Sequence, residues 1–200
     1  MPKRRLDLQL PEPERASAMI ISECRRSIDG AAKRIIRRAL LPLLKRYWRL
    51  SELGEGFHWP SNMKLKIAPG SRIGRYAYIG EGFDGSGPVV VGDLCMISAG
   101  LHIFGADHDF EVPGLPTRLG FPQSARPVTT FGLDAWVGRD VLVREGVYIG
   151  AGAVVASGSV VTRNIEPYTI VAGIPAKIIR QRFPAGSVEP HEARIRKLRD

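Results

Sequence analysis

The chain has 200 residues, of which 24% are charged and 44% hydrophobic, and it contains 22 glycines and 15 prolines. This length suits one domain with a sizeable core plus an arm, and the glycines and prolines suit a chain that turns often. Its two cysteines, Cys24 and Cys95, are too few for a disulfide framework and indicate a reducing, cytoplasmic setting. No run of 18 apolar residues and no signal-peptide pattern is present, so the sequence predicts neither a membrane span nor export.

Positive charge is concentrated at the N-terminus. Residues 1–50 hold 13 Lys and Arg against 5 Asp and Glu, whereas residues 51–200 hold 16 against 15. The arm therefore carries +8 of the formal net charge of +9. Such an asymmetry suggests that the arm meets an anionic partner.

The arm begins with a proline-containing stretch, residues 1–18, for which we expect an extended or disordered chain. From about Met19 to Leu50, apolar residues recur at helical spacing with basic residues between them, and Pro42 should kink or split this helix. Two interpretations stay open. The apolar face caps the open end of the domain that follows or pairs with a neighbouring subunit, or residues 19–50 make peripheral contact with an anionic membrane. Nucleic acid is not expected as a partner, because no aromatic-interleaved basic motif accompanies the charge.

After a linker over residues 51–66, the sequence repeats every six residues, first over 67–103 and again over 131–166. Period six fits neither a helix nor an ordinary strand, and it is typical of a parallel β-helix. The first position of each hexapeptide is apolar and the second is mostly very small. In the second run the first positions are Phe131, Val137, Val143, Ile149, Val155 and Val161.

Three hexapeptides would form one triangular coil of 18 residues, and coils would stack about 4.8 Å apart, the spacing of hydrogen-bonded strands. Several coils are needed to bury a core. We therefore expect three segments: a basic helical arm and linker over 1–66, a β-helix over 67–175, and a helical tail over 176–200. Gly173 and Pro175 are expected to end the last coil and to begin a short helix.

The two runs of hexapeptides are out of register, because Phe131 follows Ile103 by 28 residues, which is not a multiple of six. An excursion must leave the β-helix at about 104–128, and a long loop inside a compact repeat is usually functional. Its one histidine, His108, is the natural general base near neutral pH. Neighbouring carboxylates that could orient this histidine or raise its basicity are Asp107, Asp109 and Glu111.

Three stretches carry a family resemblance: VGDLCMISAGLHIFGADH, then PVTTFGLDAWVG, then VASGSVVTRNIEPYTIVAGIPAKIIR. Over roughly residues 67–183 the chain resembles the maltose, galactoside and nodulation-factor O-acetyltransferases. It is also similar to the xenobiotic acetyltransferases and to the group that acetylates surface polysaccharides. The resemblance implies a left-handed handedness for the β-helix. The expected fold is thus all-β: a left-handed parallel β-helix of hexapeptide repeats with an inserted catalytic loop, an N-terminal helical arm and a short C-terminal helix.

The resemblance also implies a mechanism. His108 would deprotonate the acceptor hydroxyl, which then attacks the thioester of acetyl-CoA directly, without an acyl-enzyme and without a metal. A backbone N–H would stabilise the oxyanion. The family's site lies between subunits, so a homotrimer is expected.

The resemblance further implies residues for both substrates. Backbone amides of Arg139 and Ser157 would hold the pantetheine arm of CoA, one coil apart. The remaining CoA contacts would be Thr162 and Arg163 near the nucleotide, Arg180 on phosphate and Trp136 beside the acetyl group. A sugar-like acceptor would meet Asp84 together with the loop carboxylates Asp107, Asp109 and Glu111.

Other members of the fold agree less well with the sequence. A γ-class carbonic anhydrase needs three zinc-binding histidines, yet residues 59–101 contain none to join His102 and His108. A non-catalytic β-helix scaffold would not need the loop with His108. The large helical N-terminal domain of serine acetyltransferases is missing.

The predicted reaction is therefore acetylation of a sugar hydroxyl in surface polysaccharide or glycolipid assembly. The enzyme would be cytoplasmic, with a possible peripheral place at the inner membrane face. Neither the N-terminal region of the maltose enzymes nor the long C-terminal extension of the xenobiotic enzymes is present, which counts against those substrates. Acetylation of an antibiotic or another small hydroxyl compound remains the alternative.

Overall fold

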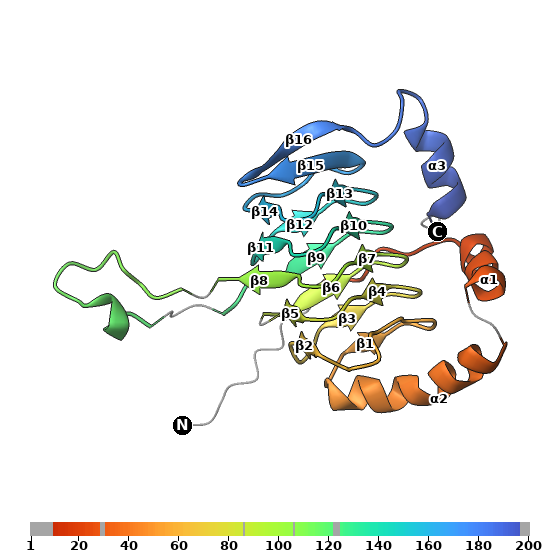
Figure 1. Ribbon diagram of the computed structural model, residues 1–200, viewed down its shortest axis with the longest axis horizontal. Coiled ribbons are helices and arrows are strands. Elements are labelled where there is room, and N and C mark those ends of the chain that lie inside the picture. The colour runs from red at the N-terminus through yellow and green to blue at the C-terminus, as the bar shows by residue number, and fades with distance from the viewer. Residues whose placement is uncertain (1–9, 29–30, 86, 106, 122–124, 197–200) are drawn as a thin grey trace.

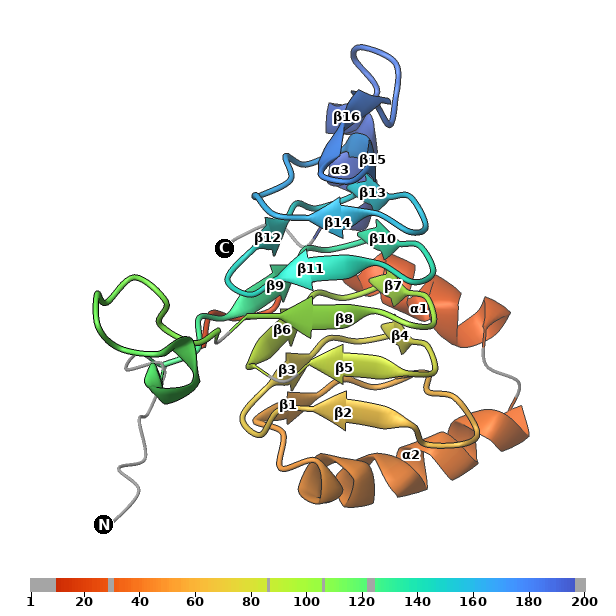
Figure 2. The same ribbon diagram turned by 60° about the vertical axis from the view of Figure 1, so that its left-hand side comes forward.

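The computed structural model describes residues 10–28, 31–85, 87–105, 107–121 and 125–196. The chain winds into a stack of three-sided coils, and one sheet forms along each side of the stack (Figures 1 and 2). This architecture confirms the predicted parallel β-helix of the hexapeptide-repeat type, with an inserted loop and helices near both ends.

Within the described residues the strands form three sheets, and every strand pairing is parallel except that of β15 with β16. Sheet 1 consists of β1 (Glu52–Leu53), β3 (Arg72–Ile73), β6 (Val89–Val91), β9 (Thr129–Phe131) and β12 (Tyr148–Ile149). Sheet 2 consists of β4 (Tyr78–Ile79), β7 (Met96–Ile97), β10 (Trp136–Val137), β13 (Val154–Val155), β15 (Thr169–Gly173) and β16 (Ala176–Gln181). Sheet 3 consists of β2 (Leu65–Ile67), β5 (Phe83–Gly85), β8 (His102–Phe104), β11 (Leu142–Arg144) and β14 (Val160–Val161).

The strand register confirms the period of six. Tyr78 pairs with Met96 and Trp136 pairs with Val154, so partners lie three hexapeptides apart. Across the insertion Met96 pairs with Trp136. The coil that holds the loop is therefore longer than the others, yet it returns to the same stacking position.

The core is the column of side chains that point into the coils. The first residue of each hexapeptide supplies it, as predicted, because this residue lies in a strand with its side chain directed inward. Each sheet contributes one aliphatic or aromatic row. Fully buried members include Ile73, Val91, Phe131 and Ile149 from sheet 1, Ile79, Ile97, Val137 and Val171 from sheet 2, and Val143 and Val161 from sheet 3.

The small second residue of each hexapeptide has a steric cause. At Gly132, a Cβ would lie 2.5 Å from the backbone N of Ala151 in the next coil. At Gly92, a Cβ would lie 2.6 Å from the backbone N of Leu133. Real Cβ contacts are not this short, so a side chain at these corners would force adjacent coils apart and weaken their hydrogen bonds.

The β-helix begins earlier than the sequence pattern predicts. The stretch 51–66, expected to be a linker, contains β1 and β2, which pair with β3 and β5. These strands do not follow the hexapeptide pattern, because this first coil packs against a helix on its outer end rather than against another coil. Phe57 is fully buried there.

The arm contains two helices, α1 (Ala18–Ser27) and α2 (Ala31–Tyr47), in place of the single predicted helix. The break lies before α2 and not at Pro42, which stays inside the helix. Pro42 and Arg38, whose carbonyl loses its helical partner, are both exposed, so water replaces the missing hydrogen bond. The sequence between the helices includes Gly30, a residue with low helix propensity.

Helix α2 lies across the open end of the first coil (Figure 2). Leu44 of α2 and Trp48, which directly follows this helix, are buried in the same cluster as the β-helix interior. The structure therefore bears out the interpretation of the arm as a cap.

The segment before α1 runs along the β-helix and is held at Asp93. This fully buried carboxylate accepts hydrogen bonds from the Arg75 side chain at 2.6 and 2.8 Å and from the Ala16 N–H at 2.9 Å. Burial and the hydrogen bond to Glu14 raise the pKa of Tyr148 to about 12, so its phenol stays protonated and donates to Glu14 at 2.8 Å. Asp93 and Tyr148, from different coils, thus hold Ala16 and Glu14 of the segment before α1.

The C-terminal region differs from the predicted helical tail. After Gly173, with a φ of 102°, the chain reverses into β16 and forms an antiparallel hairpin with β15. The segment Ala176–Gln181 includes two adjacent isoleucines, which favour a strand over a helix. A helix does follow, α3 (Val188–Ile195), and it lies beside α1. Ser17, the N-cap residue of α1, donates its backbone N–H to the Ile195 carbonyl at 2.7 Å.

We predict that Gly132→Ala lowers the free energy of unfolding in urea by roughly 1–3 kcal/mol, the usual cost of forcing extra atoms into a packed interior. Gly87→Ala is the matched control, because its Cβ would meet only the Arg126 side chain, at 3.4–3.7 Å. That control should be neutral or slightly stabilising, since alanine restricts the unfolded chain. Equal stability of the two variants would contradict the steric account of the corners.

Candidate functional site

The inserted loop, residues 105–128, projects from the stack between β8 and β9 (Figure 1). Its two ends are held by Glu145 in the next coil. The Glu145 backbone N–H donates to the Phe104 carbonyl at 2.8 Å, and its carboxylate accepts from Arg126 Nε at 2.8 Å. The loop is thus fastened at its base and carries its functional groups outward, with a short 3-10 helix, η1 (Thr117–Leu119), in its second half.

His108 is held inside this loop by a backbone group. Its Nδ1 lies 2.8 Å from the carbonyl oxygen of Gly120. A carbonyl oxygen only accepts hydrogen bonds, so Nδ1 must carry the proton, which leaves a lone pair on Nε2 of the neutral ring. The ring also lies against Phe121, with 5.7 Å between ring centroids, and the side chain is half-buried. This arrangement presents Nε2 as a base in a fixed orientation.

The Gly120 carbonyl joins the two halves of the loop. It also accepts the backbone N–H of Asp109 at 2.9 Å. A Cβ at Gly120 would lie only 2.0 Å from the Asp109 carbonyl oxygen. No larger residue therefore fits unless the two halves of the loop move apart. Glycine at this position is therefore a condition for the contact with His108.

The loop carboxylates do not orient the histidine. Asp107, Asp109 and Glu111 are exposed, and none has a recorded bond to the His108 ring within the described part of the loop. Asp109 instead accepts the Glu111 backbone N–H at 3.1 Å, a local turn contact. The contact that orients the ring, for which a carboxylate was expected, comes instead from the Gly120 carbonyl.

Asp84 lies on the outer face of sheet 3. It pairs in register with His102 of β8, the strand from which the loop departs, and its carboxylate forms an ion pair with Lys66 at 3.2 Å. Asp84 is thus near the base of the loop in the fold, while His108 is further along it.

The residues assigned to CoA fall into four places. Arg139 and Ser157 stack one coil apart at the corner between sheets 2 and 3, where the Arg139 N–H donates to Ser157 Oγ at 3.0 Å. Trp136 is half-exposed on the outer face of sheet 2, between Met96 and Val154. Arg180 is exposed on β16 and donates to the Gln181 carbonyl at 2.9 Å.

The fourth place is a surface hollow of about 630 Å³ at the corner after β14. Thr162 and Arg163 line it, as does Arg144 of the preceding coil, so two guanidinium groups face one depression. Arg144 was not predicted as a site residue, although it occupies the corresponding corner one coil before Thr162. The structure therefore brings Thr162 and Arg163 together, and likewise Arg139 and Ser157, but the two pairs lie at opposite ends of β14.

Other reactive side chains do not compete with His108. Burial raises the pKa of the Cys95 thiol, and the charge of Asp134 raises it further, so this fully buried cysteine remains protonated. Over the ranges that the structure describes, no three side chains of the types His, Cys, Asp and Glu form a group that could hold a metal ion.

Sequence comparison gives the family. No known family profile matches the chain. A chloramphenicol acetyltransferase of Klebsiella aerogenes is 32% identical over 146 residues, which cover 58% of this chain and 69% of that protein. A probable macrolide acetyltransferase of Lysinibacillus sphaericus is 32% identical over 130 residues, 57% of this chain and 68% of that one. The chain belongs to the hexapeptide-repeat acetyltransferases.

Among solved structures, AntD, an N-acyltransferase of Bacillus cereus, superposes with a TM-score of 0.54 over 76% of this acetyltransferase and 93% of that chain. The sequence identity is 18%, so this likeness supports the fold alone. The membership predicted from the hexapeptides and the histidine loop is confirmed by the relatives.

We predict that Gly120→Ala lowers kcat by about 10- to 100-fold, because a misplaced catalytic group costs this much when its geometry shifts by about an ångström. Leu119→Ala, whose side chain is exposed, is the neighbouring control and should keep nearly full activity. Melting temperatures of both variants should match the wild type, since the loop stands outside the coils. An unchanged kcat in Gly120→Ala would show that the carbonyl contact does not position His108.

Proposed function

We propose that this acetyltransferase moves the acetyl group of acetyl-CoA to a sugar hydroxyl, with His108 as the general base. The observation that carries the proposal is the hydrogen bond from His108 Nδ1 to the Gly120 carbonyl. It leaves Nε2 unprotonated and oriented on a loop that leaves the β-helix. A base of this kind is what an alcohol acceptor needs, because a neutral hydroxyl is a weak nucleophile.

The reaction would run in one direct transfer. Nε2 takes the hydroxyl proton while the oxygen attacks the thioester carbonyl carbon, which gives a tetrahedral oxyanion. A backbone N–H is proposed to stabilise that charge. The intermediate then collapses with cleavage of the C–S bond, and the proton on Nε2 passes to the departing CoA sulfur. This route needs no enzyme nucleophile, which agrees with the buried and protonated state of Cys95.

The donor would bind along the C-terminal coils. We assign CoA phosphates to the hollow that Thr162 and Arg163 share with Arg144, because guanidinium groups pair with phosphate in a bidentate geometry. Arg180 on β16 would add a further contact. Arg139 and Ser157 would meet the pantetheine arm, and for this the Arg139 N–H must exchange its bond with Ser157 Oγ for one to the donor.

The acceptor would lie at the loop. Exposed carboxylates accept hydrogen bonds from sugar hydroxyls, and Asp107, Asp109 and Glu111 surround the histidine in the chain. Asp84 near the loop base would provide another contact, in exchange for its ion pair with Lys66.

A second acceptor class is antibiotics and related small hydroxyl compounds. The observation that favours it is the identity of the sequence relatives, a chloramphenicol acetyltransferase and a probable macrolide acetyltransferase. The same base and donor would serve, and only the groups that select the acceptor would differ.

We further propose a homotrimer with each site between two subunits. Its support is the apolar row on the outer face of sheet 2, where Tyr78, Met96 and Trp136 are adjacent and 39–50% exposed. Trp136 would then lie beside the acetyl group at the boundary of two chains. Sedimentation equilibrium should give three times the mass of one chain, and an active monomer would exclude this assembly.

We also propose that the arm holds the enzyme peripherally at the cytoplasmic face of an anionic membrane, where lipid-linked glycans would be accessible. The support is an exposed apolar stripe on α2, next to the buried capping residue Leu44. Ile36, Leu40, Leu43 and Tyr47 follow helical spacing and are 38–72% exposed. Exposed Lys45 and Arg46 lie in the same turns. No helix within the described residues is long and apolar enough to cross a bilayer.

We predict that His108→Ala lowers kcat by about 10²–10⁴, the usual contribution of a general base, with little change in CoA affinity. The assay follows release of free thiol from acetyl-CoA with a panel of glycans, chloramphenicol and a macrolide. Efficient turnover of a glycan alone supports the sugar acceptor, whereas turnover of an antibiotic alone would replace it by the second class. Turnover near the wild-type value in His108→Ala would remove this residue from the mechanism.

For the arm, we predict co-sedimentation with phosphatidylserine-containing vesicles at low salt and release at high salt, because each basic residue near such a surface contributes about 1 kcal/mol within a Debye length. Leu40→Ser/Leu43→Ser should abolish binding. Ile178→Ser/Ile179→Ser removes as many exposed apolar residues from β16 and should leave binding unchanged. Failure of the wild type to sediment at low salt would leave α2 as a cap only.

A further inference from the structure

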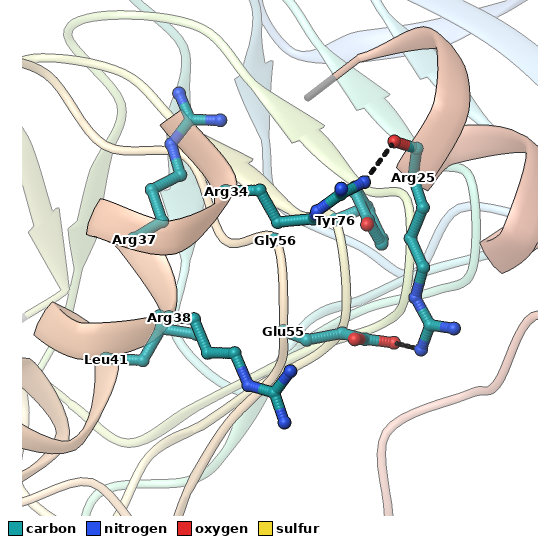
Figure 3. A pocket seen from close by; sticks show the side chains of 8 residues that line it. All are labelled: Arg25, Arg34, Arg37, Arg38, Leu41, Glu55, Gly56 and Tyr76. Carbon is teal, nitrogen blue, oxygen red and sulfur yellow. Dashed lines mark hydrogen bonds and ion pairs between the residues drawn. The ribbon is translucent and has the colours of Figure 1, made fainter. Parts of the chain in front are cut away.

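A second cationic cavity lies at the opposite end of the β-helix from the proposed donor hollow. It has a volume of about 600 Å³ and opens between α1, α2 and the first corner of the β-helix. This size is in the usual range for small-molecule sites. The cavity is lined by Arg25, Arg34, Arg37, Arg38, Leu41, Glu55, Gly56 and Tyr76 (Figure 3).

Positive charge dominates the lining. Four of the eight lining residues are arginines, and Glu55 is the one carboxylate among them. That carboxylate is engaged by Arg25, whose Nη2 lies 2.5 Å from Glu55 Oε1, and this bond raises the pKa of Arg25. The three arginines of α2 bring three further positive charges to the same cavity.

The arginines of α2 approach Arg25 from across the cavity. Figure 3 shows Arg34 and Arg38 extending from α2 toward α1. Arg34 Nη1 donates to the Arg25 backbone carbonyl at 3.3 Å, a partner that brings no charge. Arg37 contacts the His58 ring. Arg38 is exposed, with no recorded side-chain contact inside the described part of the chain. Like charges held this close raise the energy of the fold unless an anion joins them.

The floor of the cavity is built with unusual backbone geometry. Gly56 has a φ of 67°, and a Cβ there would lie 2.5–2.7 Å from the Tyr76 ring. Tyr76 itself has a φ of 53° and is buried. The Tyr76 N–H donates to the Glu55 carbonyl at 2.8 Å. The β-helix therefore fixes the floor of the cavity, and the two arm helices form its walls.

We propose that this cavity binds a phosphoryl dianion, as a phosphate monoester or a diphosphate, and that the bound anion locks α1 and α2 onto the first coil. Several planar guanidinium groups around one concave site match the oxygens of such a group. The site is separate from acetyl transfer, because it lies at the first coil and uses none of the residues assigned to donor or acceptor. A free phosphate compound and the headgroup of a lipid both present this chemistry.

The test is titration calorimetry with inorganic pyrophosphate on the full-length protein. Arg34→Gln/Arg38→Gln should weaken binding at least 10-fold. Arg46→Gln removes the same kind of charge from an exposed position of α2 outside the cavity, and it should bind within 2-fold of the wild type. Saturating pyrophosphate should also raise the melting temperature of the wild type and of Arg46→Gln but not that of the double variant.

Acetyl transfer measured on the same proteins separates this proposal from the proposed function, because all three should be equally active and folded. Absence of saturable pyrophosphate binding to the wild type, or equal affinity of the double variant, would overturn the site. Vesicles containing phosphatidic acid assign the source: release of bound protein by pyrophosphate supports a lipid headgroup in the cavity. Pyrophosphate binding without any competition from the vesicles supports a free phosphate compound.

Discussion

The close stacking of successive coils is the constraint on which this structure depends. Strand hydrogen bonds set the distance between coils, and at the corners the backbone of one coil touches the backbone of the next. Gly132 leaves no room for a Cβ beside Ala151, and Gly92 leaves none beside Leu133. The inward rows of aliphatic side chains then fall on one another at fixed intervals. Every other feature of the chain is attached to this rigid stack.

Attachment to a rigid stack explains how a long loop can carry a catalytic group. The coil with the insertion closes in the same register as its neighbours, since Val91 pairs with Phe131 across it. Glu145 in the next coil holds both ends of the loop. Within the loop, the Gly120 carbonyl then orients the His108 ring. The position of the ring thus depends on the scaffold and on one hydrogen bond from a side chain to the backbone, while the carboxylates remain exposed.

The repeat could be predicted from sequence because each coil meets the same surroundings. The surroundings of an inward residue such as Ile149 or Val161 are set by the coils above and below it, so the same residue type recurs every six residues. That reasoning fails where a coil meets something else. The first coil packs against Leu44 of α2 and against Trp48 just after it, and its strands show no hexapeptide pattern. At the other end, the isoleucines of Ala176–Gln181 pair with β15, a tertiary contact that local sequence does not reveal.

The site divides in the same way. His108 could be singled out from the sequence, because a histidine in a loop that interrupts a repeat is distinctive by residue type, and its role as the base stays a prediction. Its partner could not, because a backbone carbonyl carries no residue-type signal and Gly120 lies 12 residues away across the loop. The arginine cavity could not be predicted either, because it forms where α1 and α2 bring Arg25 and Arg38 together. The apolar pattern in the sequence did not show where one of these helices ends and the next begins.

The role of His108 depends on which ring nitrogen carries the proton. Long-range ¹H–¹⁵N correlation spectra of protein labelled at histidine nitrogens measure this directly, with His108→Ala to assign the resonances. The hydrogen bond to Gly120 predicts that the neutral ring is protonated at Nδ1 and bare at Nε2. A neutral ring protonated mainly at Nε2 would contradict the account, because the base would then have no lone pair to offer the acceptor hydroxyl.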